Sequence, residues 1–498
     1  MARSRRSRSR RSSSAPKARI SPLAIVRATL DAIVVGFFLL ILLVSPLPMG
    51  ANRDWAWAPI TVVIGIVAVL VALGLGSRDA LATAPQERLP LGALIVCFLL
   101  MLGIGLLQMS PLAPAGPSAP FYARAAAVLG RAHAAVPTLS IDTSLGTLLR
   151  CLACGLVFAV ARIFCADERR ARLLLFTLIA SAILVMIYAV LELQVHSCFV
   201  GNYLKKQGEY VPTDRCTMSG TFVNSNSFGC FLGMAVAAAI GLVFAEQKPR
   251  RRAEAVEEQG RFVTAITGVR LALIAVALFL MGGLLFSASR GGFAAFALSM
   301  VLFTLLLMRG RWRSRRQMGG ALIGGIVAIG VMIALAGGTF VQKMATFAQA
   351  NSFERPIIWK AAVQAIGKSP WLGWGLGSFG DIYTVLQPTQ IPMGNDKAHS
   401  TPLETFVELG IPGGVIACLV VLIPWITIWR GAVRRRRHRY LPAAAFAASS
   451  VAIIHSLADF SLQMPAIGFF VSALLGMGWA QSFNFSEHSS HPFTEPLE

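Results

Sequence analysis

One histidine, His399, stands at the end of a long segment that interrupts the apolar sequence, and imidazole is well suited to moving protons near neutral pH. The segment runs from about Gly337 to Pro402 and is rich in glycine and aromatic residues, above all from Pro370 to Phe379. Long loops in compact proteins are uncommon and often carry function. A lone histidine is usually structural, so we treat His399 as a candidate general base on these grounds alone.

Two arginines stand where an anionic group would be held at a membrane surface. Arg290 lies in Ser287–Gly292, a short turn between two apolar segments, and Arg215 lies in a polar loop further upstream. A guanidinium can hold a diphosphate through paired hydrogen bonds. It can equally extend along the apolar surface toward lipid phosphate. The residues alone favour neither interpretation.

Tryptophans of the long segment can serve as interface anchors or as stacking surfaces for sugars. Arg355 and Trp359 are four residues apart, which places them on one face of a short amphipathic helix. Trp371 and Trp374 flank the glycines of the same segment. The sequence predicts that Arg355 and Trp359 contact a substrate, with membrane anchoring as the alternative.

Polar residues also mark the beginnings of two apolar helices. Asn224 and Asn226 precede a helix, and capping that helix requires only one of them. We therefore list Asn226 as a candidate contact. Glu404 and Glu408 begin the helix after His399, where carboxylates suit the helix dipole without any catalytic role. Glu408 is kept as a candidate that orients His399 or contacts a substrate.

Other acidic residues bear on a transport function. His455 and Asp459 are four residues apart near the outer end of a helix, a spacing that favours a structural pair. Asp31 and Glu192 are the main acidic residues within apolar segments. They are too few to define a substrate path, and no inverted pair of broken helices is visible. A polysaccharide-lipid transporter is therefore the alternative to an enzyme.

The elements that must position these residues are membrane helices. The chain has 498 residues, of which 55% are hydrophobic and 14% charged, whereas soluble domains carry about a quarter charged residues. Apolar runs near the length of a bilayer span recur throughout. The sequence predicts an all-α polytopic membrane protein of about twelve helices with one long outer loop. The predicted helices span residues 23–45, 59–76, 90–109, 145–165, 171–195, 222–245, 268–287, 291–308, 319–338, 404–429, 441–458 and 465–482.

The basic residues fix the expected orientation. Net charge is +22, and the lysines and arginines gather at the N-terminus and in alternate loops, which is the positive-inside pattern. Both termini are then cytoplasmic, and the loop over residues 338–403 is periplasmic. Residues 1–20 are expected to form a disordered basic tail, 21–482 the membrane domain and 483–498 a second tail. This distribution favours membrane lipids, not nucleic acid, as the partner of the basic residues.

Cys198 and Cys216 lie in one outer loop and are expected to form a disulfide in an oxidising compartment. A bridge closing a loop of this size contributes about 3 kcal/mol in the chain-entropy model. Cys151 and Cys154 form a CxxC inside an apolar segment, where packing is a better explanation than metal or redox chemistry.

Taken in order, these pieces resemble the O-antigen ligase and polymerase family of membrane glycosyltransferases over about residues 200–470. The resemblance is carried by Arg215, Gly220–Phe222, Asn224, Asn226, Ser289–Gly292, Arg355, Trp359, the glycines Gly373, Gly375 and Gly377, His399, Glu408, Gly410, Gly413, Asp459 and Pro465.

The resemblance implies a GT-C-like fold and a metal-independent, cofactor-free inverting transfer at the periplasmic face of a bacterial inner membrane. The donor would be an undecaprenyl-diphosphate-linked glycan and the acceptor a hydroxyl of lipid A core, as in a ligase. A polysaccharide polymerase or a protein O-oligosaccharyltransferase of the same family is the alternative. The resemblance assigns diphosphate binding to Arg215 and Arg290 and the role of general base or acceptor orientation to His399.

Overall fold

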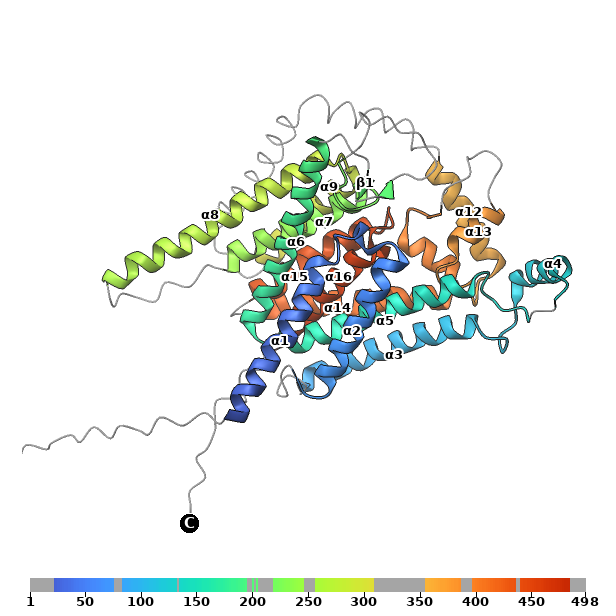
Figure 1. The fold of residues 1–498 in the computed structure, drawn as a ribbon, viewed down its shortest axis with the longest axis horizontal. Coiled ribbons are helices and arrows are strands. Elements are labelled where there is room, and N and C mark those ends of the chain that lie inside the picture. Colours follow the sequence, from blue (N-terminus) through green and yellow to red (C-terminus); the bar gives the residue numbers. More distant parts are fainter. Residues whose placement is uncertain are drawn as a thin grey trace, which may run out of the picture.

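The protein is an all-α membrane protein in a computed structural model (Figure 1). The structure describes residues 22–75, 83–131, 134–194, 199–200, 203–204, 218–245, 256–308, 354–386, 396–435 and 439–483. The strands of the described part are β1 (Phe199–Val200) and β2 (Tyr203–Leu204), which pair antiparallel. The predicted fold class is confirmed.

Nine described helices are long and apolar enough to cross a membrane. They are α1 (Pro22–Val44), α2 (Asp54–Ala72), α3 (Pro85–Gln108), α5 (Ile141–Phe164), α6 (Glu168–Gln194), α7 (Ser225–Ala245), α8 (Val256–Phe286), α9 (Arg290–Met308) and α14 (Thr401–Arg434). Two shorter apolar helices follow, α15 (Tyr440–His455) and α16 (Pro465–Ala480). These eleven correspond to eleven of the predicted helices; the one expected at 319–338 lies outside the described residues.

The largest difference in helix bounds concerns α8. The sequence analysis placed its beginning at residue 268, whereas the helix begins at Val256. The added residues, 256–267, carry charged side chains at Glu257, Glu258 and Arg261. Hydropathy detects only the apolar part of a helix, so a polar extension outside the bilayer escapes it.

The centre of the bundle is made of α7, α15 and α16, whose residues are almost entirely buried (Figure 1). α15 packs against α7 and α9, and α16 packs against α5. Small residues permit this closeness: a side chain at Gly241 of α7 would collide with Ala444 of α15. In a bilayer the hydrophobic effect does not drive helices together, so helices associate through close packing of small residues.

The segments at the end of the bundle that holds α12 and α13, called the outer segments below, include a small core of their own beside the bundle. The helices of this core are α12 (Glu354–Lys368) and α13 (Phe379–Leu386), whereas α4 (Ala119–Leu129) and the single-turn helices η1 (Met49–Ala51), η3 (Gly116–Ser118) and η5 (Ser461–Gln463) contribute none of its residues. Figure 1 shows α4, α12 and α13 together at one end of the bundle. Ile358, Trp374, Phe379 and Val407 are buried together there. The predicted amphipathic helix around Arg355 is α12, which this core fixes against α14.

The beginning of α14 bends at Gly410, whose φ of 70° lies in the left-handed region. The bend lets the glycine-rich segment approach, because Ile411 donates its amide to Pro370 O at 2.7 Å. A Cβ at Gly410 would lie 2.6 Å from Trp371 O. The glycine therefore fits a close backbone approach that positions the first turns of α14.

Candidate active site

Asp459, in the turn between α15 and α16, is the centre of a polar cluster drawn from four separate parts of the chain. Its Oδ2 accepts a hydrogen bond from Asn226 Nδ2 at 2.7 Å and lies 3.6 Å from an Arg355 terminal nitrogen. Its Oδ1 accepts the Phe460 amide at 2.7 Å and lies 3.9 Å from His399 Nδ1. The carboxylate is almost fully buried. A buried carboxylate with this many donors is arranged to stay ionised.

His399 adopts a left-handed backbone conformation, with φ of 50°, that non-glycine residues adopt infrequently. The residue before it is held from two sides. Trp359 Nε1 donates to Ala398 O at 2.9 Å, and Glu404 Oε2 accepts the Ala398 amide at 3.0 Å. Strain of this kind persists only where surrounding contacts over-determine it.

The residues after His399 are attached to the α15–α16 turn. Thr401 donates its amide to Ser456 O at 2.9 Å, and its hydroxyl donates to Asp459 O at 3.1 Å. His399 thus lies between two anchored points, one on α12 and α14 and the other on the turn that carries Asp459.

The imidazole of His399 lies partly open to the outside, with 25% of the side chain exposed. Its ring meets Phe460 edge-on at 5.3 Å between centroids. Nδ1 is buried and faces Asp459 at a distance too long for a hydrogen bond. Nε2 makes no hydrogen bond within the described part of the chain, so it can meet a substrate.

The charges of the cluster are stabilised mutually. Burial opposes ionisation of Asp459, but the imidazoles of His399 and His455 outweigh it and hold the pKa of Asp459 below its usual value. Burial also opposes the charge of Lys397, yet its pKa is raised, mainly by Glu404 at 3.3 Å. Asp459 is therefore an anion and Lys397 a cation at neutral pH.

Arg290 is the first residue of α9 and is half-buried. The helix is capped locally, because Ser289 Oγ accepts the Gly292 amide at 3.1 Å. Arg290 makes no hydrogen bond or ion pair with any residue that the structure describes. The turn borders the cluster, since a Cβ at Gly291 would lie 3.0 Å from Nε2 of the buried His455. This arrangement leaves a guanidinium and a helix N-terminus open to an anion.

The two asparagines at the beginning of α7 make different contacts. Asn224 caps the helix, its Oδ1 accepting the Ser227 amide at 2.7 Å. Asn226 is not needed for capping and binds Asp459 instead. The structure thus places Asn226 in the cluster through the carboxylate.

The aromatic and basic residues of the long segment also fall into two groups, those that contact the cluster and those that do not. α12 presents Trp359 to the His399 turn and Arg355 to the turn that carries Asp459, Arg355 donating to Ala458 O at 3.0 Å. Trp374 is buried and donates to Ala365 O at 2.8 Å, so it belongs to the core of the outer segments. Trp371 is 76% exposed, as an interface anchor is.

Glu408 contacts the glycine-rich segment. Its Oε1 accepts the Phe379 amide at 3.3 Å, and its carbonyl oxygen accepts from Gln108 Nε2 at 2.7 Å. Gln108 in turn accepts the Leu376 amide at 3.0 Å. Glu404, one turn earlier, is the residue that supports the His399 turn directly.

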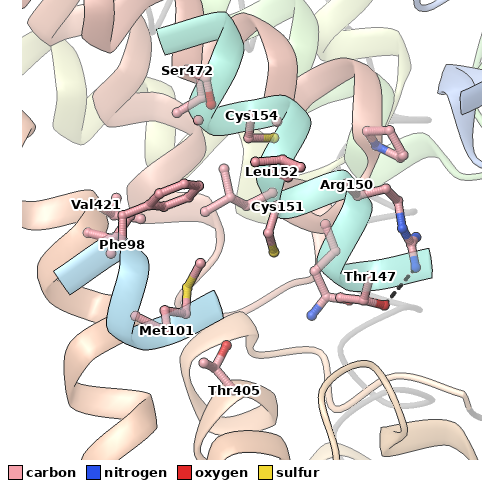
Figure 2. A pocket seen from close by; sticks show the side chains of 18 of the residues that line it. Phe98, Met101, Thr147, Arg150, Cys151, Leu152, Cys154, Thr405, Val421 and Ser472 are labelled. Carbon is pink, nitrogen blue, oxygen red and sulfur yellow. Dashed lines mark hydrogen bonds between the residues drawn. The ribbon is translucent and has the colours of Figure 1, made fainter. Parts of the chain in front are cut away.

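A cavity of about 820 Å³ lies beside the cluster, between α3, α5, α14 and α16. Thr401, two residues after His399, and Phe460, whose ring meets the imidazole of His399, both line it. Figure 2 shows part of this cavity, with Phe98 and Met101 of α3 on one side, Cys151 and Cys154 of α5 on the other, and the hydrogen bond from Arg150 to Thr147.

Some predicted residues lie outside the described part of the chain, namely Arg215, Cys198 and Cys216. Conversely, the sequence analysis missed three residues. Asp459 was interpreted as a structural partner of His455, Glu404 as a dipole partner, and Arg150 was not considered. A carboxylate just past an apolar helix was the signal for Asp459; no sequence signal links Glu404 to Ala398.

The chain was also compared with known proteins. No curated protein matches it significantly. Residues 274–418 match the protein family described as O-antigen ligase, a span that contains Arg290, Arg355 and His399. Asn226 and Asp459 lie outside the matched span, although both belong to the cluster. This part of the multi-pass membrane protein is therefore similar to the O-antigen ligase family.

Proposed function

We propose that the protein transfers a glycan from a polyprenyl-diphosphate donor to a hydroxyl acceptor at the periplasmic face of the inner membrane, as an O-antigen ligase does. The observation that carries the proposal is the convergence of His399, Asp459 and the unpaired Arg290 at one end of the bundle. The similarity of residues 274–418 to the O-antigen ligase family supports the reaction class.

In the proposed reaction, Nε2 of His399 accepts the proton of the acceptor hydroxyl while its oxygen attacks the anomeric carbon. The bond from that carbon to the diphosphate oxygen breaks, and the polyprenyl diphosphate leaves with the electron pair. Attack opposite the leaving group inverts the anomeric configuration. Asp459 lies beside the imidazolium that forms and stabilises its charge, as the carboxylate of a catalytic triad does. General base catalysis of this type contributes about 10²–10⁴-fold.

Arg290 holds the diphosphate in this mechanism. Its guanidinium has no protein partner among the described residues, and it stands at the N-terminus of α9. Positive groups fixed where negative charge develops stabilise the transition state, typically by about 3–4 kcal/mol per donor. Arg215 is expected to act with it.

Arg355, Trp359 and Asn226 position the reacting groups. Trp359 and Arg355 tie the His399 turn and the Asp459 turn to α12. Asn226 fixes the Asp459 carboxylate from α7. The exposed parts of Arg355 and Trp359 can still meet a sugar, since both side chains are about one third exposed.

The test is the variant His399→Ala in the full-length protein. We expect normal membrane insertion and a loss of glycan transfer of at least about 100-fold, in line with the removal of a general base. Transfer is measured with purified protein, a polyprenyl-diphosphate glycan and a lipid A–core acceptor. The matched control is Trp371→Ala, because Trp371 is exposed. His455→Ala is less suitable, because His455 is buried in the cluster.

Full transfer by His399→Ala would remove His399 from the mechanism. A deletion strain distinguishes the acceptors: long lipid-linked chains that remain unattached indicate a ligase, and single repeat units indicate a polymerase. Loss of glycan from a protein indicates protein O-glycosylation. Loss of glycan attachment in the deletion strain, with the lipid-linked glycan retained on the inner side of the membrane, would favour a transporter.

A further inference from the structure

His455, the last residue of α15, is buried without a hydrogen bond. The residue is 3% exposed, and neither Nδ1 nor Nε2 has a partner within the described part of the chain. Buried polar groups in native proteins nearly always have a hydrogen-bond partner. Because the imidazole bonds to nothing here, hydrogen bonding that holds the bundle together does not explain a histidine at this position.

The imidazole faces the N-terminus of α9. A Cβ at Gly291, the second residue of α9, would lie 3.0 Å from Nε2 and 3.2 Å from Cδ2 of His455. Glycine therefore allows the first turn of α9 to lie directly against this edge of the ring. No side chain separates the imidazole from the backbone of the turn.

The same turn has free donors for an anion. The Gly292 amide is used by Ser289 Oγ at 3.1 Å, whereas the amides of Arg290 and Gly291 make no hydrogen bond with any residue that the structure describes. The N-terminus of a helix with free amides attracts negative charge. His455 is thus a buried, unpartnered group that lies against a candidate anion site.

Charged groups surround His455 from several elements. Asp459, in the turn after α15, attracts a proton to the imidazole, and Arg355 of α12 repels it. Arg290 stands on the turn of α9 that the ring faces. His399 shares the carboxylate of Asp459 from the other side. Two guanidinium groups therefore oppose one carboxylate in the protein without a ligand.

The other helices packed on α15 add no free charge near His455. α16 has no charged residue, and Cys230 is the one titratable residue of α7. The carboxylates of α14 are used elsewhere, Glu404 by the Ala398 amide and Glu408 by the Phe379 amide. The charge of His455 is therefore decided by the groups at its own end of α15.

His455 is placed where its charge can change. Burial without a hydrogen-bond partner favours the neutral imidazole. The C-terminal end of α15 favours a cation, because the helix dipole is negative there. Small environmental changes move a histidine between its two charge states near neutral pH. A diphosphate at the N-terminus of α9 is a multiply charged anion, and it would change the balance of charge beside the ring toward protonation.

We propose that His455 takes up a proton when the donor diphosphate binds at the N-terminus of α9, and so gives that site a second positive charge besides Arg290. The proton comes from solvent and is released again when the polyprenyl diphosphate leaves, so no covalent bond to carbon or phosphorus changes. His455 is a positioning residue, because it acts through the α9 turn without touching the donor. The proposal rests on the glycan transfer proposed above.

Proton uptake makes donor affinity depend on pH. The diphosphate raises the proton affinity of His455, so the added binding is fully present where the free protein already holds the proton. It is lost as the pH rises until even the complex gives the proton up. Between these limits the affinity falls by up to about tenfold per pH unit for one proton.

The first test counts protons by calorimetry. Farnesyl diphosphate, a short prenyl diphosphate, is titrated into the full-length protein in nanodiscs, at neutral pH, in two buffers of different ionisation enthalpy. The wild type should take up about one proton more than His455→Gln. The matched control is His438→Gln, which makes the same chemical change between α14 and α15 and should behave as the wild type. Ionisation of the probe is common to all three proteins. Equal uptake by the wild type and His455→Gln would overturn the proposal.

The variant Arg290→Gln separates this proposal from the proposed function. It should weaken farnesyl diphosphate binding about tenfold or more, because a charge-assisted hydrogen bond is lost. Unchanged affinity in Arg290→Gln, or no binding by the wild type, would overturn both proposals. Weaker binding by Arg290→Gln together with equal proton uptake in His455→Gln would overturn the role of His455 alone.

The second test uses steady-state transfer. The KM for the polyprenyl-diphosphate donor should rise more steeply with pH in the wild type than in His455→Gln, by up to about tenfold per pH unit. A merely structural histidine would change KM by the same factor at every pH, so parallel profiles would contradict the proposal. Unfolding curves identify a variant that has lost its fold, in which case His455→Asn replaces His455→Gln.

A measurement that leaves His455 in place completes the test. In the His399→Ala protein with ¹⁵N-labelled histidine, farnesyl diphosphate should convert one neutral imidazole signal into that of an imidazolium. If no imidazole becomes charged on addition of the probe, the proposal fails.

Discussion

The residues of the cluster are best understood through the contacts that they share. Asp459 contacts one residue from α7, one from α12 and the His399 turn, so one carboxylate sets the positions of three elements. Arg290 differs, because no described residue pairs with it. Groups that a protein leaves unpaired near a polar cluster are those that a ligand can pair.

The variant Arg290→Lys tests whether Arg290 binds the donor diphosphate through two parallel hydrogen bonds. We expect a loss of transfer of about tenfold or more, since an ammonium keeps the charge but cannot reproduce two parallel hydrogen bonds. Steady-state transfer is measured with the donor varied. The matched variant is Arg88→Lys; Arg88 is exposed near the beginning of α3, far along the chain from the Arg290 turn. Equal activity of Arg290→Lys and wild type would favour contact with membrane phosphates.

At the scale of elements, apolar runs predict helices well because a bilayer demands about twenty apolar residues in a row. The same reasoning placed α15 and α16 within a few residues of their bounds. It could not show that Asn226 meets Asp459, because the two are 233 residues apart and no periodicity links them. The bend at Gly410 was likewise invisible, since it depends on a backbone approaching from residues 370–373.

Gly410→Ala tests the importance of that bend. The left-handed φ and the contact with Trp371 O predict a cost of about 1–3 kcal/mol in the free energy of unfolding and reduced transfer, because the first turns of α14 carry Glu404. Gly367→Ala is the control: Gly367 lies in α12, and a Cβ there meets nothing within 4 Å. It should be neutral or more stable, by up to about 1 kcal/mol. The unfolding midpoints of both variants are measured in detergent. An unchanged midpoint for Gly410→Ala would show that the bend is not required.

At the scale of the whole molecule, the bundle has polar groups at both ends. One end carries the cluster. The opposite end carries a buried group in which Glu87 of α3 meets Arg162 of α5, and Trp479 of α16 donates to Glu87 Oε1 at 2.7 Å. The sequence analysis missed Glu87 because it began that helix at residue 90. One carboxylate here joins three helices that form the walls of the cavity.

Removing one partner of a buried ion pair leaves the other charge uncompensated, at a cost of about 3–5 kcal/mol, whereas neutralising both partners costs far less. Arg162→Met should therefore destabilise the protein strongly. Glu87→Gln combined with Arg162→Met should restore most of the stability, because the Gln carbonyl can still accept from Trp479. The free energy of unfolding in mixed detergent micelles measures both variants. Arg172→Met is the control, because the Arg172–Glu168 pair is about one third exposed and should contribute little. If the double variant is as unstable as Arg162→Met alone, the pair does not stabilise the bundle through charge, and the packing of Arg162 against its neighbours must account for the loss.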